Sequence, residues 1–315
     1  MYEKWKGVHT RCAFNMIQEL IPLTRPRTLA AALGPTILGA AFSYYAFGAV
    51  QGTGLAIFHT ILIFLAVVTA QIVANLWNEY KDFKSGLDAG QKIGNAGSIT
   101  RGVITPELII TMIKVLMFVP IIIGLYLSAT ITWYYIPVGF LCILISFLYS
   151  GGPKPISRTP FGEISSGIAM GFAIILITGY AWIRELSLAL LIPAIPSTLL
   201  VGSIMLTNNI RDIRNDESHG RHTLPIVLGR ERALSLMSIS YIFNFIWIIA
   251  WIIVGHMTWF ALLAFLAAPL AFKTIHTLST NTDEFQLDKA MGTTAGAAMI
   301  YQLMWAIGLI MGKLI

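Results

Sequence analysis

The sequence predicts an all-α, polytopic membrane protein with nine transmembrane helices. Of its 315 residues, 56% are hydrophobic and only 11% are charged, whereas a soluble domain carries about 25% charged residues. The mean hydropathy is +0.74. Long apolar stretches recur along the chain, without the short alternating segments that are typical of a membrane β-barrel. These observations exclude an ordinary soluble fold.

Each expected helix is an apolar stretch long enough to cross the hydrocarbon core, which takes roughly 20 residues. The nine stretches lie near residues 28–48, 54–80, 106–128, 130–149, 161–183, 187–210, 232–254, 257–274 and 291–312. We expect a single transmembrane domain over residues 1–315, with two four-helix pseudo-repeats followed by a ninth helix. Residues 1–24 lack the apolar core of a cleavable signal, so we expect a cytoplasmic or interfacial segment there.

The basic residues predict the orientation of these helices. All but three of the 21 basic residues fall on the side of the N-terminus; the exceptions are Lys114, Arg184 and Lys313. The positive-inside rule therefore places the N-terminus in the cytoplasm, which fits a protein integral to the cell membrane. The net charge of +6 alone could indicate a nucleic-acid partner. This one-sided distribution is instead typical of a membrane protein, so we expect contact with the lipid bilayer and no nucleic-acid partner.

A polar stripe marks the end of the second expected helix, which continues as "QIVANLWNEYKDFKSGLD". Gln71, Asn75, Asn78 and Asp82 are spaced by 4, 3 and 4 residues, so they share one face of a helix. Gly86 follows, and glycine tolerates the left-handed conformation that commonly ends a helix. The stripe therefore predicts polar side chains gathered at the cytoplasmic end of this span.

Two similar clusters of acids occur at equivalent places in the expected halves. In the first, Asp88 follows Asp82 by six residues, and a turn after the helix would bring it back toward Asp82. In the second, Asn208, Asp212 and Asp216 are spaced four apart within "NNIRDIRND". One such cluster is equally well explained as a solvated helix end, but two equivalent clusters beside a membrane indicate function.

Carboxylate and amide oxygens are the hard ligands that suit Mg²⁺, which often uses one or two carboxylates together with substrate phosphates. Two facing clusters would hold Mg²⁺ ions against a diphosphate. Arginine and lysine bind the same anion, and the candidate bases among the acids are Arg25, Arg101, Lys154, Arg211 and Arg221. The sequence contains no Walker A motif, so nucleotide hydrolysis has little support.

These motifs resemble the intramembrane prenyltransferases of the UbiA superfamily over almost the whole chain. The longer spacing of the first cluster resembles, within that superfamily, the 1,4-dihydroxy-2-naphthoate polyprenyltransferases of menaquinone synthesis. Further stretches carry the same resemblance: "RPRTL" at 25–29, "YSGGPKPISRTPFGE" at 149–163 and "GRHTLPIVLG" at 220–229. One feature departs from the superfamily, which often has Tyr-x3-Lys where Tyr149 and Lys154 are five residues apart.

The resemblance implies Mg²⁺-dependent transfer of a polyprenyl group from polyprenyl diphosphate to 1,4-dihydroxy-2-naphthoate, with loss of diphosphate and CO₂, giving demethylmenaquinol. It also implies the roles of the site residues. The metal ligands would be Asp82, Asp88, Asp212 and Asp216. Asn78, Asn208 and Arg211 would bind or orient the metal and diphosphate. The catalytic set would be Asp82, Asp212, Arg25, Arg101, Lys154, Arg221 and Tyr149, with the bases neutralising the leaving group and Tyr149 facing the allylic cation.

Two alternatives remain at this stage. Prenyl transfer to another acceptor, namely 4-hydroxybenzoate, homogentisate or a glycerol-phosphate lipid, uses the same scaffold. A secondary transporter also shows repeats and intramembrane charges, but it places its site near the midplane of the bilayer. Here the acids lie at one end of the spans, which favours the enzyme.

Overall fold

The computed structural model describes residues 20–86 and 98–315, apart from the side chains of Arg27 and Ala30. The expectations for residues 1–19 and for Asp88 therefore lie outside the described residues. The α-helices that lie wholly within the described residues are α2 Ala30–Phe47, α3 Thr53–Ser85, α4 Pro106–Thr130, α5 Tyr135–Ser150, α6 Gly162–Ser166, α7 Ala173–Ile183, α8 Leu191–Arg211, α9 Ile213–Ser218, α10 Leu224–Leu228, α11 Arg230–Ile253, α12 Ala268–Thr280 and α13 Glu284–Leu314. No strand occurs in the described part, as predicted.

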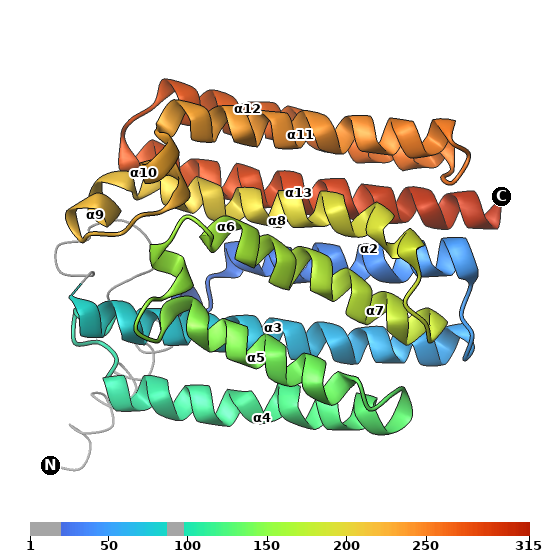
Figure 1. Cartoon of the computed structure of the whole chain (residues 1–315), viewed down its shortest axis with the longest axis horizontal. Coiled ribbons are helices and arrows are strands. Elements are labelled where there is room, and N and C mark those ends of the chain that lie inside the picture. The colour runs from blue at the N-terminus through green and yellow to red at the C-terminus, as the bar shows by residue number, and fades with distance from the viewer. Residues whose placement is uncertain (1–19, 87–97) are drawn as a thin grey trace, which may run out of the picture.

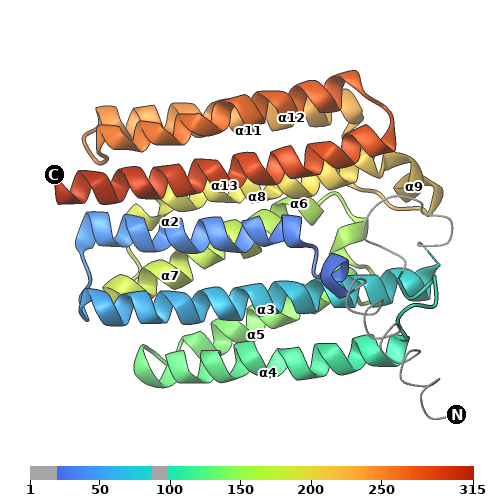
Figure 2. The ribbon, with the colours of Figure 1, turned by 180° about the vertical axis from the view of Figure 1, so that it is seen from behind.

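The long helices form a bundle whose members run roughly along one direction (Figure 1). α11 and α12 lie at one edge, α13 and α8 come next, and α3, α5 and α4 lie toward the opposite edge, as the view from behind also shows (Figure 2). The short helices α9 and α10 gather at one end of the bundle. This end also receives the C-terminal ends of α3 and α8, so both polar clusters come together there.

Seven helical segments are long and apolar enough to cross a membrane: Thr53–Ser85, Pro106–Thr130, Gly162–Ile183, Leu188–Arg211, Arg230–Ile253, Trp259–Thr280 and Glu284–Leu314. The expectation of nine spans is therefore confirmed for seven. The other two expected stretches fold as α2, with 18 residues, and α5, with 16 residues. The helix α5 is shorter than the roughly 20 residues that a span needs. The division into two four-helix halves stays a prediction.

The outer surface of the bundle carries large apolar side chains. On α4, Phe118 and Ile122 are each 62% exposed, and on α11, Ile239 and Ile246 point outward to a similar extent. Contiguous apolar surface of this kind marks contact with a membrane or a partner. Polar side chains such as Thr207 and Gln302 are buried between helices instead. This inverted distribution is the one expected where lipid surrounds a helical bundle.

Two glycines allow the continuous helical segment from α6 to α7 to pack closely against α8. The segment Gly167–Phe172 between α6 and α7 is π-helical. A Cβ atom added at Gly171 would lie 2.6 Å from the backbone nitrogen of Thr198, and one at Gly167 would lie 2.5 Å from the carbonyl oxygen of Thr198. Any larger residue would push the helices apart. This close approach aligns the start of α6 with the end of α8, where the second cluster begins.

Candidate active site

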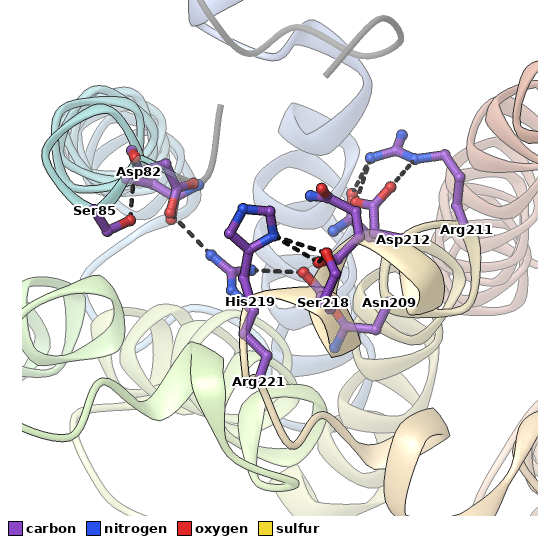
Figure 3. A network of polar contacts seen from close by, with 12 residues as sticks. Asp82, Ser85, Asn209, Arg211, Asp212, Ser218, His219 and Arg221 are labelled. Carbon is purple, nitrogen blue, oxygen red and sulfur yellow. Dashed lines mark hydrogen bonds and ion pairs between the residues drawn. The ribbon is translucent and has the colours of Figure 1, made fainter. Parts of the chain in front are cut away.

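A shared arginine joins the two acidic clusters. The Arg221 guanidinium lies 2.9 Å from Oδ1 of Asp82 through Nη2 and 3.2 Å from Oδ1 of Asp216 through Nη1 (Figure 3). Asp82 belongs to α3 and is 8% exposed; Asp216 belongs to α9 and is 2% exposed. Buried charges require a partner, and breaking such a pair is strongly destabilising. The two motifs predicted to face each other therefore meet across one cation.

Local backbone structure places Arg221 between them. Asp212 ends α8 and also precedes α9, whose first turn is closed by a 2.8 Å hydrogen bond from the Asp216 amide to the Asp212 carbonyl. After α9 the chain turns back through Gly220 at φ +67°, and the Arg221 amide donates to the Asp216 carbonyl at 3.0 Å. A residue with a side chain would be strained at that φ. The turn thus holds Arg221 over Asp216.

A second arginine holds Asp212. Arg211 donates to both carboxylate oxygens of Asp212, with Nε–Oδ1 at 2.7 Å and Nη2–Oδ2 at 2.8 Å. Its Nη2 also donates to Oδ1 of Asn208, and its Nη1 lies 2.9 Å from Oδ1 of Asp288 on α13. Paired N–H donors on one carboxylate are among the strongest side-chain contacts. Arg211 therefore fixes the direction of the Asp212 carboxylate.

Asp216 lies in a different environment, because burial raises its pKa to about 7. Arg221 opposes this rise, and the negative charges of Asp212 and Asp82 add to it. Its Oδ2 atom is buried and has no hydrogen-bond partner within the described part of the chain. A buried carboxylate oxygen without a partner is costly unless a cation or proton occupies it. This oxygen is therefore suited to receive a positive ion.

The stripe on α3 and the end of α8 line one cavity of about 130 Å³. Arg25, Asn78, Tyr149, Asn208 and Arg221 all face it, as do Gln71 and Asn75 from the predicted stripe. Three of the four residues of the predicted stripe therefore line one cavity, whereas Asp82, the fourth, contacts Arg221 instead. The helix also ends as expected, since Gly86 adopts the left-handed conformation at φ +74° directly after Ser85.

Two contacts shape this cavity. Asn78 accepts a hydrogen bond of 2.9 Å at its Oδ1 from the Ser150 hydroxyl, which joins α3 to α5. Arg25 has φ +50°, a conformation that a residue with a Cβ atom rarely adopts. Strained backbone of this kind concentrates at functional sites, where the surroundings hold it in place. In this protein the residue with the strained backbone is Arg25 itself, which lines the cavity.

The sequence analysis missed one buried pair beside the site. Glu163, in the first turn of α6, is 6% exposed and accepts a 2.8 Å hydrogen bond at Oε1 from the Asn209 amide. Its Oε2 atom has no partner within the described residues. Asn209 lines the cavity next to Asn208. An acidic residue such as Glu163 at the start of an apolar span is a sequence signal for function. Its partner Asn209, on α8, could not be predicted from residue spacing.

Not every predicted residue comes to the cavity. Lys154 is exposed and does not line it. Arg101 is also exposed and donates to the Ser98 hydroxyl at 3.2 Å. Arg211 holds Asp212 from the side away from the cavity and lines a different pocket. The carboxylates of Asp82, Asp212 and Asp216 also lie outside the cavity lining. The roles expected for all of the site residues stay predictions.

Within the described residues, no group of three or more His, Cys, Asp or Glu side chains is arranged to hold a metal ion. The donor set nevertheless suits a hard divalent cation, because carboxylate and amide oxygens from both clusters converge near Arg221. The unpartnered Oδ2 of Asp216 adds a free ligand atom. The residues therefore fit a divalent metal, which Asp82 and Asp216 would help to hold.

The fold and the residues at its polar end are those of an integral membrane enzyme. The chain belongs to the UbiA prenyltransferase family, whose model matches residues 32–306. It is 34% identical over 303 residues to the 1,4-dihydroxy-2-naphthoate octaprenyltransferase of Bacillus subtilis. The aligned region covers 94% of this chain and 93% of the relative. The enzyme of the same description from Mycobacterium tuberculosis is 28% identical over 297 residues, or 92% of this chain and 96% of the relative.

Solved structures share the fold. A UbiA homologue from Aeropyrum pernix superposes with a TM-score of 0.67 at 17% identity, covering 90% of this chain and 97% of that one. A UbiA homologue from Archaeoglobus fulgidus bound to DMAPP and Mg²⁺ superposes with a TM-score of 0.60 at 16% identity, covering 93% and 99%. The all-helical membrane fold and the resemblance to this superfamily are both confirmed, and the protein is a prenyltransferase.

Proposed function

We propose that the protein transfers a polyprenyl group from polyprenyl diphosphate to 1,4-dihydroxy-2-naphthoate, releasing diphosphate and CO₂ and giving demethylmenaquinol. The relatives described above, named for this acceptor and matched over more than nine-tenths of the chain, support the reaction. The observation that carries the proposal for the site is the meeting of Asp82 and Asp216 at Arg221. It joins two distant motifs beside one cavity that contains further basic and amide groups.

We assign the cofactor as Mg²⁺. The ligands proposed for it are Asp82, Asp212 and Asp216, together with Asp88 from outside the described residues. When bound, the metal supplies Lewis-acid stabilisation of the charge that develops on the diphosphate. Asn78 and Asn208 border the same cavity and offer amide oxygens that bind or orient these groups. Arg211 holds the Asp212 carboxylate in a fixed position beside Asn208.

The chain's own cations act on the leaving group. Arg25 and Arg221 line the cavity, and each offers several N–H donors to phosphate oxygens. As the C–O bond breaks, its electron pair leaves with the diphosphate, and fixed donors stabilise that charge. Arg101 and Lys154 are proposed to approach from the adjoining loops once the diphosphate binds. The ring of Tyr149 borders the cavity, where an aromatic face stabilises the allylic cation until the naphthoate ring attacks it.

We further propose that residues 1–315 form one transmembrane prenyltransferase domain in the cell membrane, with the N-terminus and the active site on the cytoplasmic side. The distribution of basic residues supports this orientation. An apolar bundle surface beside a charged cavity also suits a substrate with a lipid tail and a diphosphate head.

The test uses purified full-length protein in detergent with Mg²⁺ and geranylgeranyl diphosphate. 1,4-Dihydroxy-2-naphthoate and 4-hydroxybenzoate are offered in parallel, and products are followed by mass. We expect metal-dependent product from the naphthoate, at a mass that includes loss of CO₂. Asp82→Asn should abolish it, whereas the matched variant Asp283→Asn, an exposed helix-capping residue, should not. Product from the benzoate alone would be consistent with the proposed site but would show that the naphthoate is not the acceptor.

A further inference from the structure

A second pocket lies at the same end of the bundle but apart from the candidate active site. Its volume is about 320 Å³, and it lies between the end of α8, the helices α9 and α10, and the first residues of α11 and α13. It shares no lining residue with the active-site cavity. Pockets of 300 Å³ or more are large enough to bury a small ligand or a headgroup. Arg211 is the one lining residue that also contacts the candidate active site, through Asp212 and Asn208.

The pocket is lined by three arginines, of which two keep an uncompensated charge. Arg211 is neutralised by Asp212 and Asp288. Arg214 makes no ion pair within the described part of the chain and is exposed. Arg230 donates only to neutral carbonyls, those of Leu278 and Asn281 at the end of α12. The Nε atom of Arg230 is buried and has no partner among the described residues.

The backbone adds to this positive character. Gly229 precedes α11, and no side chain caps that 24-residue helix, so its first amide groups lack side-chain acceptors. Unsatisfied amides and the helix dipole favour an anion at such an end. Two acids, Glu217 and Glu284, also line the pocket. Both are exposed at its rim and, within the described residues, neither pairs with Arg214 or Arg230.

The apolar part of the pocket indicates where the anion comes from. Ile213, Ile226 and Leu287 line it beside the arginines. Next to it, Val227 and Phe285 are each 57% exposed. Side chains of this kind at the end of a membrane-spanning bundle suit acyl chains and glycerol rather than water. An arginine cluster with an apolar border is the chemistry that recognises a phosphate carried by a lipid.

We propose that this pocket binds the phosphate group of an anionic phospholipid. Arg214 and Arg230 hold the phosphate oxygens, the uncapped amides of α11 add donors, and the apolar residues cover the glycerol end. The site is separate from the prenyl diphosphate site, so its occupancy does not depend on the proposed reaction. Binding is therefore measured directly, without turnover.

The experiment uses full-length protein in a neutral detergent, titrated with dioleoylphosphatidylglycerol and, separately, with dioleoylphosphatidylcholine. Lipid retained per chain is measured by native mass spectrometry. We compare Arg214→Gln with Arg232→Gln, a matched variant that removes an exposed charge nearby but outside the pocket lining. Because a charge-assisted hydrogen bond is lost, Arg214→Gln should weaken phosphatidylglycerol binding about tenfold. Arg232→Gln should leave it near the wild-type value, and Arg214→Lys should restore part of the loss.

Inorganic phosphate forms a further arm, measured as a thermal shift in neutral detergent. If phosphate stabilises the wild type but not Arg214→Gln, and phosphatidylglycerol has no preference over phosphatidylcholine, the site takes a soluble phosphate and the lipid assignment is overturned. Equal phosphatidylglycerol binding by the Arg214→Gln and Arg232→Gln variants would overturn the site itself. Arg214 has no ion-pair partner among residues 20–86 and 98–315, so its variant should melt at the wild-type temperature without lipid, which separates binding from folding.

Discussion

The two ends of the bundle each contain a polar network built around one arginine, and the two differ in what the arginine contacts. At the site end, Arg221 lies between two buried carboxylates. At the opposite end, Arg184 donates to the Thr130 carbonyl at 3.1 Å and to the side-chain oxygen of Gln51. Gln51 in turn lies 3.2 Å from Nδ1 of His59.

The difference separates a structural network from a functional one. At the far end, the Arg184 charge is met by neutral oxygens near the ends of α3, α4 and α7 rather than by carboxylates. At the site end, negative charge exceeds what one guanidinium neutralises, and a carboxylate oxygen of Asp216 has no partner within the described residues. This buried oxygen, without a partner in the part of the chain that is described, is suited to receive a bound ion.

The largest expected effect is at Asp82. Replacing it by Asn removes a proposed metal ligand while keeping the size of the side chain. Loss of one preorganised charge-stabilising group costs about 10²–10³ in kcat. We expect a fall of at least this size in naphthoate prenylation, measured by product mass. A variant that keeps more than a tenth of wild-type activity would contradict the role of Asp82.

The next effect concerns Arg221. Arg221→Ala leaves Asp82 and Asp216 buried without their shared partner, which costs about 3–5 kcal/mol of stability. Thermal unfolding without metal should show this loss. Saturating Mg²⁺ should recover most of it, because a metal held by these carboxylates would supply the positive charge that the variant lacks. If Mg²⁺ stabilises the variant no more than the wild type, the metal does not bind between these carboxylates.

Metal affinity should depend on pH through Asp216. Its pKa is raised to about 7, so below pH 7 the carboxyl is protonated and metal binding must displace that proton. The apparent affinity for Mg²⁺ should fall by about tenfold for each pH unit below 7 and level off above it. Isothermal titration at pH 5.5 to 8.5 measures this. Asp216→Asn should bind metal more weakly and with a flatter pH profile.

The smallest effect is expected at the far end. Gln51→Ala removes the acceptor of Arg184 and the neighbour of His59. We expect a loss of about 1–2 kcal/mol in the free energy of unfolding, typical of buried hydrogen bonds. The value of kcat, measured where the variant is folded, should stay unchanged. A large fall in kcat would mean that the two ends of the bundle are coupled. It would contradict the view that the network around Arg184 is only structural.

The sequence predicted the helices well because a span needs apolar length, and length is local information. The expected stretch 161–183 became Gly162–Ile183, and 187–210 became Leu188–Arg211. The stripe on α3 was predicted equally well, since helical spacing alone puts Asn78 and Asp82 on one face. The count of nine spans went further than the structure supports, because the short α5 depends on its packing rather than on its own length.

The arrangement of the site was less predictable. Their spacing places Asp212 and Asp216 on one helix face. In the structure, however, Asp212 forms an ion pair with Arg211, and Asp216 forms one with Arg221. These partners are chosen by the turn after α9 and by Asp288 on α13, which lies 77 residues from Arg211. Contacts of this kind depend on how helices pack, and a single sequence does not display them.

The length of α3 has a consequence for how the enzyme meets its substrates. At 1.5 Å per residue, its 33 residues span about 50 Å, whereas the hydrocarbon core is about 30 Å thick. Asp82, near the end of that helix, therefore lies at the level of the lipid headgroups. The proposed prenyl diphosphate donor would rest there with its tail in the bilayer, and the proposed quinol product would leave in the same plane. Turnover should then follow the mole fraction of the prenyl donor among the lipids, and not its concentration in the bulk volume.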